Sequence, residues 1–246
     1  RGPLLAVELD LRTPEGLRRV GIIAQERTVN HGSWSPEHHQ LAATLLREFA
    51  RLKLPVITLI DTPGADAGEA ANRANQAHSI SALIAEMAQI DVPVVGIVIG
   101  AGYSGGAIPL GTANLLLAVR DGVFNTIQPR GLASIARKQG LAWQECARLV
   151  GVSAYELCRL GYLDGIIDFV PGEDPANFVR AVTTAVGAVE SGVLRFAARH
   201  PQFLDHYARS VQRRLAPSAE LQKVRELSSL ADCPHHRSRQ LGRDDR

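Results

Sequence analysis

Glycines gather at the end of an apolar stretch in the middle of the chain, and their spacing points to chemistry done by the backbone. Residues 94–99 are Val, Ile and Gly only, and they lead directly into Gly100, Gly102, Gly105 and Gly106. An uncharged apolar run that ends in glycines predicts a buried strand, a tight loop and a helix that begins near Gly105.

A second loop of the same kind lies earlier in the chain. The apolar run at residues 54–60 leads into DTPGADAG, residues 61–68. A bounded apolar run of this length is typical of a buried strand. Two buried strands that each end in a glycine-bearing loop suggest one site built from both loops.

Backbone N–H groups are the chemical groups that such loops expose. At the start of a helix these groups have no intrahelical partner, and the helix dipole adds positive potential. One donor from each loop would form an oxyanion hole, which stabilises an enolate or another developing oxyanion. Glycine suits this role because a Cβ atom would obstruct an approaching carbonyl group. The alternative, that the glycines only form tight turns, stays open. The candidate donors are Gly64, Ala65, Gly68, Glu69, Gly105 and Gly106.

Three familiar glycine-loop sites fit these residues less well. The stretch lacks the Lys-Ser/Thr pair of a phosphate-binding P-loop, and Asp121 is the nearest acid for a dinucleotide fingerprint. Ser104 has the Gly-x-Ser-x-Gly spacing of a nucleophile elbow, but a hydrolase also needs an acid and a histidine. His206 with Asp164 or Asp168 is the available set, and we expect His206 to lie in a helix late in the chain. A hydrolase is therefore the less favoured interpretation.

Histidine and cysteine do not form a complete set of metal ligands. His38 and His39 are adjacent at a helix start and face different directions, so we expect them, like His31, to be solvated. We therefore predict no metal site. A further cluster lacks a fourth ligand and lies in the polar tail: Cys233, His235 and His236.

The composition narrows the class of protein and its partners. The chain has 246 residues, 46% of them hydrophobic and 5% aromatic, which is typical of an α/β core of Ala, Val, Leu and Ile. With 27 basic and 25 acidic residues, its net charge of +2 gives no support for a nucleic-acid or membrane partner. Three cysteines without CxxC spacing fit a reducing compartment, so we expect a cytoplasmic protein. The chain begins RGPLL, and we expect a processed product or a fragment.

Hydrophobic periodicity predicts strands that alternate with helices. A hairpin is expected within residues 4–25, and a Ser-Pro-Glu start predicts a helix at residues 36–52. The Ala-rich segment at residues 69–89 predicts one long helix. Further strands are expected at residues 114–119, 123–127 and within 163–171, and further helices at 131–139, 143–150, 153–160, 175–193 and 200–215.

This alternation calls for an α/β architecture with right-handed crossovers. The sequence shows no internal repeat, and no low-complexity linker precedes residue 216. We therefore expect one domain, residues 1–215, followed by a polar, disordered tail, residues 216–246.

The glycine loops and their flanks resemble the α half of the carboxyltransferase of acetyl-CoA carboxylase, a branch of the crotonase superfamily. The resemblance covers about residues 21–171 and implies an α/β fold of the crotonase-like ββα spiral type. The segments that carry it are the DTPGA motif, a VPVV strand, a Ser-Gly-Gly-Ala loop, a later helix start and a final strand, at residues 61–65, 92–95, 104–107, 126–135 and 162–171.

The same resemblance implies a reaction and its partners. A carboxyl group would pass from carboxybiotin, held on a separate biotin carboxyl carrier protein, to an acyl-CoA, with acetyl-CoA to malonyl-CoA in fatty acid biosynthesis as the expected case. The oxyanion hole would receive the biotin ureido oxygen, and Gly102, Tyr103 and Ser104 would line the biotin pocket. A β-type carboxyltransferase subunit or domain would complete an α2β2 hetero-oligomer.

The chain also departs from the family pattern. Asp66 and Ala67 stand where the family often has an aromatic residue and a proline, and Arg130 replaces an acid. No four-cysteine zinc ribbon is present, so the β half, which is expected to bind the acyl-CoA, is a separate chain or the other half of a fused one. The alternatives are another crotonase-fold enzyme, such as a malonate decarboxylase subunit, a hydratase or a decarboxylase, and a non-catalytic partner subunit.

Overall fold

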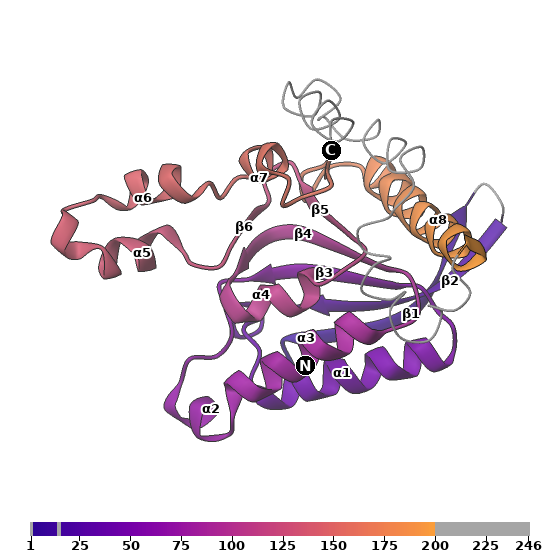
Figure 1. The fold of residues 1–246 in the computed structure, drawn as a ribbon, viewed down its shortest axis with the longest axis horizontal. Coiled ribbons are helices and arrows are strands. Elements are labelled where there is room, and N and C mark those ends of the chain that lie inside the picture. Colours follow the sequence, from indigo (N-terminus) through magenta and orange to yellow (C-terminus); the bar gives the residue numbers. More distant parts are fainter. Residues whose placement is uncertain (1, 14–15, 200–246) are drawn as a thin grey trace.

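The computed structural model describes residues 2–13 and 16–199, and these fold around one mostly parallel β-sheet (Figure 1). The strand order is β1-β2-β3-β4-β5-β7, and β6 pairs with the last residues of β4. β1 and β2 form an antiparallel hairpin, and the other named pairs are parallel. The strands are β1 (Leu4–Thr13), β2 (Gly16–Gln25), β3 (Val56–Thr62), β4 (Val94–Tyr103), β5 (Leu115–Val119), β6 (Val123–Asn125) and β7 (Gly165–Ile167).

Helices cover both faces of this sheet (Figure 1). Helices α1, α3 and α4 lie on one face, and α8 lies on the other. The helices are α1 (Pro36–Arg51), α2 (Glu69–Arg73), α3 (Gln76–Gln89), α4 (Ser104–Gly111), α5 (Pro129–Ile135), α6 (Trp143–Val150), α7 (Ala154–Leu160) and α8 (Ala176–Arg199), with 3-10 turns η1 (Asn30–Gly32) and η2 (Arg137–Gln139).

Side chains of the central strands alternate between two cores, as the two-residue period of a strand requires. In β3, Val56 and Ile60 enter the core under α1, α3 and α4, whereas Ile57 enters the core under α8. Thr58 is buried on the first side, where its Oγ1 donates to the carbonyl oxygen of Leu110 at 2.7 Å. This bond ties the C-terminal end of α4 to the sheet.

The predicted hairpin and first helix are confirmed, with one correction. Ser35 is the N-cap of α1 and Pro36 its first residue. The expectation that His39 is solvated is wrong, because the side chain is fully buried and packs edge-on to Trp34 at 5.6 Å between ring centroids. Helical periodicity explains the error, because His39 lies on the same helix face as buried Ala42. The expectation rested only on the two adjacent histidines pointing in different directions.

The predicted long helix at residues 69–89 is two helices, α2 and α3. The break falls at Asn75, which takes a left-handed backbone conformation with φ 63°. Asparagine tolerates this conformation better than most residues, so it is a natural place for a break. The high helix propensity of the surrounding alanines concealed this interruption.

Three further elements differ in their bounds from the expectation. Strand β4 does not end before the glycines but continues through them to Tyr103, because β6 pairs with its last three residues. The strand expected at 123–127 is shorter, and the helix expected at 131–139 begins at Pro129 and ends at Ile135. For the two strands, pairing between β4 and β6, rather than local propensity, sets the boundary.

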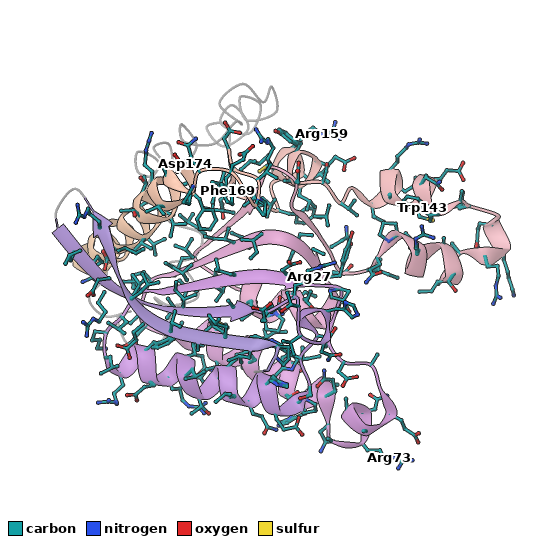
Figure 2. The ribbon with its side chains drawn as sticks, turned by 180° about the vertical axis from the view of Figure 1, so that it is seen from behind. Arg27, Arg73, Trp143, Arg159, Phe169 and Asp174 are labelled. Atoms are coloured by element: carbon teal, nitrogen blue, oxygen red, sulfur yellow. The ribbon has the colours of Figure 1, made fainter. Side chains whose placement is uncertain are left out.

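Residues 129–150 form an arm that projects from the body of the molecule (Figure 1). Helices α5 and α6 pack against each other along this arm, and the Arg130 guanidinium lies over the Trp143 ring, 4.8 Å from its centroid. Figure 2 shows Trp143 on the arm, away from the layered body. Large apolar side chains on the arm, Ile135 and Leu149 among them, are exposed.

The helix predicted at residues 200–215 and the tail lie outside the described residues. No helix within residues 2–13 and 16–199 combines the length and the apolar character that crossing a bilayer requires.

Candidate functional site

The two glycine loops meet backbone to backbone at one end of the sheet. Because β3 and β4 are parallel neighbours, the loops that follow them emerge at the same edge. A Cβ atom on Gly106 would lie 2.5 Å from the carbonyl carbon of Gly64 and 2.6 Å from the nitrogen of Ala65. No side chain fits there without moving one loop. The structure thus brings together the loops that the sequence suggested as one site.

Asp61 holds the strand ends together through an irregularity between β3 and β4. The pairing register shifts at this residue, so Asp61 alone faces residues 99–101. Its Oδ1 accepts the Ala101 N–H at 2.9 Å and a hydrogen bond from Arg27 at 2.7 Å. A Cβ atom on Gly100 would lie within 2.8 Å of the same carboxylate. The carboxylate therefore fills space that glycine leaves open.

A buried glutamine at the end of β2, Gln25, bridges the two loops. Its Nε2 donates to the carbonyl oxygen of Gly106 at 2.8 Å, and its Oε1 accepts the N–H of Asp61 at 3.0 Å. Sequence reasoning did not single out this residue. The available signal was a polar residue directly after the buried apolar run of β2.

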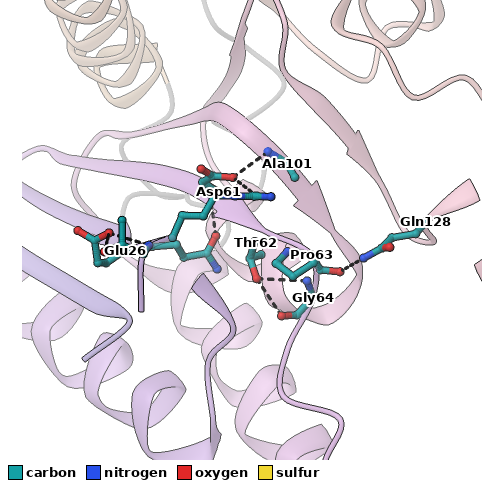
Figure 3. Close-up of polar contacts among 10 residues, drawn as sticks. Glu26, Asp61, Thr62, Pro63, Gly64, Ala101 and Gln128 are labelled. Carbon is teal, nitrogen blue, oxygen red and sulfur yellow. Dashed lines mark hydrogen bonds and ion pairs between the residues drawn. The ribbon is translucent and has the colours of Figure 1, made fainter. Parts of the chain in front are cut away.

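The first loop is fixed by hydrogen bonds to its own backbone (Figure 3). Thr62 Oγ1 accepts the Gly64 N–H at 3.2 Å and donates to the Gly64 carbonyl oxygen at 2.8 Å. Gln128 Nε2 donates to the Pro63 carbonyl oxygen at 2.6 Å. These bonds hold Gly64 at φ 145°, a conformation that favours glycine. The next N–H, that of Ala65, has no hydrogen-bond acceptor within the described residues.

The end of the first loop turns away from this donor. The Gly68 N–H donates to Asp66 Oδ1 at 2.8 Å, and the Asp66 N–H donates to the Trp34 carbonyl oxygen at 3.0 Å. Glu69 begins the five-residue helix α2, is exposed, and pairs with Arg73. The Gly68 N–H and the Glu69 side chain are thus engaged by local contacts.

The second loop makes a sharp turn from β4 into α4. Ser104 is exposed and has φ 58°, which is uncommon for a residue other than glycine. Gly105 and Gly106 follow in the first helical turn, where an α-helix offers its N–H groups no acceptor. The N-cap residue Tyr103 makes no side-chain cap hydrogen bond. Gly105 packs against Ile80, whose Cδ1 would lie 2.9 Å from an added Cβ.

The three residues expected to line a pocket lie in different surroundings. Gly102 is buried, and an added Cβ would lie 2.7 Å from the Phe124 ring, so its glycine makes room for packing. Tyr103 is partly buried, and this burial raises the pKa of its hydroxyl. Ser104 is exposed to solvent and lies beside the first loop. A Cβ atom added to Gly64 would be 3.7 Å from the Cβ atom of Ser104.

The three carboxylates in and directly after the first loop are engaged by neighbouring groups. Asp61 pairs with Arg27, Asp66 accepts the Gly68 N–H, and Glu69 pairs with Arg73. Figure 2 shows Arg27 at the end of the sheet from which the arm extends. The site therefore presents backbone donors rather than a free acid or base within the described residues.

The acids considered for a serine hydrolase have structural partners elsewhere. Asp164 Oδ2 accepts the Leu116 N–H at 2.9 Å, and Asp168 Oδ1 accepts a hydrogen bond from Arg120 at 2.8 Å. His206 lies outside the described residues, as does the Cys233, His235 and His236 cluster. In the part of the chain that is described, no group of three or more His, Cys, Asp or Glu side chains is arranged to hold a metal ion.

Comparison with known sequences identifies the family. A model of the family described as acetyl co-enzyme A carboxylase carboxyltransferase-like matches residues 19–202. The acetyl-coenzyme A carboxylase carboxyl transferase subunit alpha of Cereibacter sphaeroides is 36% identical over 175 residues, which cover 71% of this chain and 55% of that protein. A beta/alpha protein of Salinispora arenicola is 39% identical over 160 residues, 64% of this chain and 28% of its own length. The chain thus spans about half the length of the subunit-alpha relative.

Solved structures share the fold at low sequence identity. The transcarboxylase 12S structure aligns with a TM-score of 0.66 at 18% identity, and the alignment covers 75% of this chain and 35% of the transcarboxylase chain. A chain of the Pseudomonas malonate decarboxylase hetero-tetramer in complex with malonate aligns with a TM-score of 0.63 at 17% identity. That alignment covers 98% of this chain and 90% of the decarboxylase chain. The predicted crotonase-like α/β fold is confirmed. With a family match that extends over most of its length, the chain belongs to the acetyl-CoA carboxylase carboxyltransferase-like family.

Proposed function

We propose that this chain is the α-type half of the carboxyltransferase centre of a cytoplasmic, biotin-dependent acyl-CoA carboxylase. The observation that carries the proposal is the contact between Gly106 and the Gly64–Ala65 peptide, which brings N–H donors of two loops to one place. The reaction is carboxyl transfer from carboxybiotin, held by a biotin carboxyl carrier protein, to an acyl-CoA. Acetyl-CoA is the expected acceptor, in line with the names of the relatives.

Ala65, Gly105 and Gly106 supply the oxyanion-hole donors in this proposal. Of the six candidates, these lie at or next to the contact, and within the described residues their N–H groups have no loop or capping partner. Gly64 and Gly68 donate within the first loop instead. Because α4 points its N-terminal end at the contact, its dipole adds to the stabilisation of negative charge there.

The donor set fits the biotin ureido group. A ureido oxygen is a hydrogen-bond acceptor, and a set made of backbone N–H groups offers donors without any competing acceptor. When bound, biotin would supply the carboxyl group on its ureido ring and a ureido carbonyl oxygen that gains negative charge as the carboxyl group leaves. Ala65, Gly105 and Gly106 would bind this oxygen, and Tyr103 and Ser104, which flank the contact, would orient the ring.

The engaged carboxylates favour carboxyl transfer over hydration of an enoyl-CoA. A hydratase needs a positioned acid or base that exchanges a proton with the substrate. Asp61, Asp66 and Glu69 are all held by neighbouring groups. Carboxyl transfer depends on stabilising an oxyanion, for which backbone donors suffice.

A β-type partner would complete the site, and the arm is the surface we assign to it. The arm begins at the site, since Gln128, directly before α5, donates to the Pro63 carbonyl oxygen. It exposes Ile135 and Leu149. The fused beta/alpha relative supports a partner of this type, and an α2β2 assembly is the expected form.

Reconstitution tests the proposed function. The chain is mixed with a β-type carboxyltransferase subunit and a biotinylated carrier domain, and carboxylation of the carrier from radiolabelled malonyl-CoA is measured. We expect label on biotin only when both subunits are present. Turnover of an enoyl-CoA by the chain alone would overturn the proposal.

A malonate decarboxylase-type role is the second candidate, because that enzyme's chain aligns over 90% of its length with 98% of this one. The same mixture distinguishes the two. Release of carbon dioxide from a malonyl thioester at equal rates with and without biotin would favour the second candidate.

A further inference from the structure

Gln25 uses both ends of its side-chain amide to join the two loops of the site. The residue is 4% exposed. Its Nε2 donates to Gly106 in the first turn of α4, and its Oε1 accepts the N–H of Asp61 at the start of the first loop. A single buried side chain thus spans both halves of the proposed oxyanion hole.

The sheet explains why an amide is needed at this place. The parallel ladder between β2 and β3 ends at the pair Ala24 and Leu59, while β3 continues to Thr62. The Asp61 N–H lies beyond the end of this ladder. The Gln25 side chain therefore accepts the hydrogen bond that a neighbouring strand would otherwise accept. An N–H shielded from water and left unpaired destabilises a protein. The position requires one acceptor and one donor at once, and a neutral amide supplies both.

We propose that Gln25 is a positioning residue for the oxyanion hole. The proposal rests on the function proposed above. By binding Gly106 and Asp61 together, Gln25 sets the first turn of α4 against the first loop, so the N–H groups of Ala65, Gly105 and Gly106 converge on one oxygen. Such donors act only when held within about 0.5 Å of the productive geometry.

Thr58 on strand β3 provides a matched control, because its side chain binds the same helix, α4. Its Oγ1 donates to the Leu110 carbonyl oxygen at 2.7 Å, whereas Gln25 donates to Gly106 at 2.8 Å. Both bonds are buried and both tie α4 to the sheet. The Thr58 bond holds the C-terminal end of the helix, away from the donors.

The experiment compares Gln25→Met and Thr58→Val in the reconstituted complex. Gln25→Met is expected to lower kcat about 100-fold, the loss typical of a small misplacement at a reacting centre. KM for the acyl-CoA should stay within about twofold, because uniform binding is unaffected. Thr58→Val should leave kcat within about twofold while lowering the melting temperature. Equal kcat losses in the two variants, or an unchanged kcat in Gln25→Met, would overturn the inference.

Gln25→Glu separates the two bonds. An ionised carboxylate still accepts the Asp61 N–H but cannot donate to Gly106, so kcat should fall as in Gln25→Met, and the buried charge beside the Gly106 carbonyl oxygen should also lower the melting temperature. Because a protonated Glu could still donate to Gly106, kcat is measured across pH, and a wild-type kcat that stays unchanged as pH rises would show that the Gly106 bond is not the one that matters.

A second readout does not depend on activity. In the full chain labelled with [15N]glycine, the amide resonances of Gly105 and Gly106 should shift in Gln25→Met and Gln25→Glu but not in Thr58→Val. If the wild-type complex transfers no carboxyl group, the proposed function fails, yet these resonances still test the positioning. Resonances that stay in place in both Gln25 variants would overturn it.

Discussion

Each loop glycine leaves room for a close neighbour, and that neighbour differs from one glycine to the next. At Gly106 an added Cβ would meet the backbone of the first loop, at Gly102 the Phe124 ring, and at Gly105 the flexible end of Ile80. The sequence interpretation attributed glycine to the approach of a substrate carbonyl. The structure adds an earlier requirement, because the loops need these glycines to pack before any substrate arrives.

Gly106 and Gly105 should therefore respond differently to alanine. Gly106→Ala forces backbone atoms apart and should lower the free energy of unfolding by about 1–3 kcal/mol, the usual cost of overpacking. Gly105→Ala displaces only the Ile80 Cδ1 atom, so its free energy of unfolding should change by less than about 1 kcal/mol. Urea unfolding of the two variants measures both values. Equal losses would show that the loops do not meet as described.

His39 should make stability depend on pH. Its Nδ1–H donates to the Ser35 carbonyl oxygen, and its buried Nε2 has no partner in the described structure. Burial, with a smaller effect of neighbouring His38, lowers the pKa of His39 from the ordinary 6.5. The unfolded chain therefore binds a proton near pH 6.5 that the folded chain does not, and stability falls as pH drops below that value.

The measurement is urea unfolding between pH 7.5 and pH 5. The slope contributed by His39 cannot exceed about 1.4 kcal/mol per pH unit. His39→Leu loses the bond to Ser35 and starts less stable, but this part of the slope should disappear. An identical slope in the variant would contradict the assignment.

At the scale of elements, the irregular end of β4 couples a glycine to a carboxylate. An alanine at Gly100 would place its Cβ 2.5 Å from Asp61 Oδ1. Gly100→Ala should lower the free energy of unfolding by about 1–3 kcal/mol. In an Asp61→Ala background the space is open, so the same change should be less costly. A double-mutant cycle should give a coupling energy on the order of 1 kcal/mol, and additive losses would argue against the contact.

Periodicity and motif spacing predicted the strands, the first helix and the meeting of the two loops. They missed the break at Asn75, because a single left-handed residue leaves no trace in an Ala-rich pattern. They also missed Gln25, whose role depends on where the β2–β3 ladder ends. Such a partner is set by sheet register, which a single sequence does not encode locally. The proposed donors Ala65, Gly105 and Gly106 were among the candidates, but separating them from Gly64 and Gly68 required the hydrogen bonds.

At the scale of the whole molecule, the arm is the part least explained by the fold itself. Helix α5 buries none of its residues, and Cys146 is the residue that α6 buries. Exposed apolar side chains on a projecting element mark an interaction surface. The arm also carries more basic than acidic side chains, so we expect an acidic rim on the partner; its charged residues are Arg130, Arg137, Lys138, Arg148 and Glu145.

Leu149 and Leu17 offer a matched test of this surface. Leu149 on the arm is 70% exposed and Leu17 on the hairpin is 72% exposed, so neither supports the core of the isolated chain. Leu149→Asp places a charge in the proposed interface and should weaken binding of the β-type subunit at least about tenfold, a change of about 1.4 kcal/mol. Leu17→Asp should leave the affinity unchanged. Isothermal titration calorimetry measures both, and equal affinities for the two variants would place the partner elsewhere on the molecule.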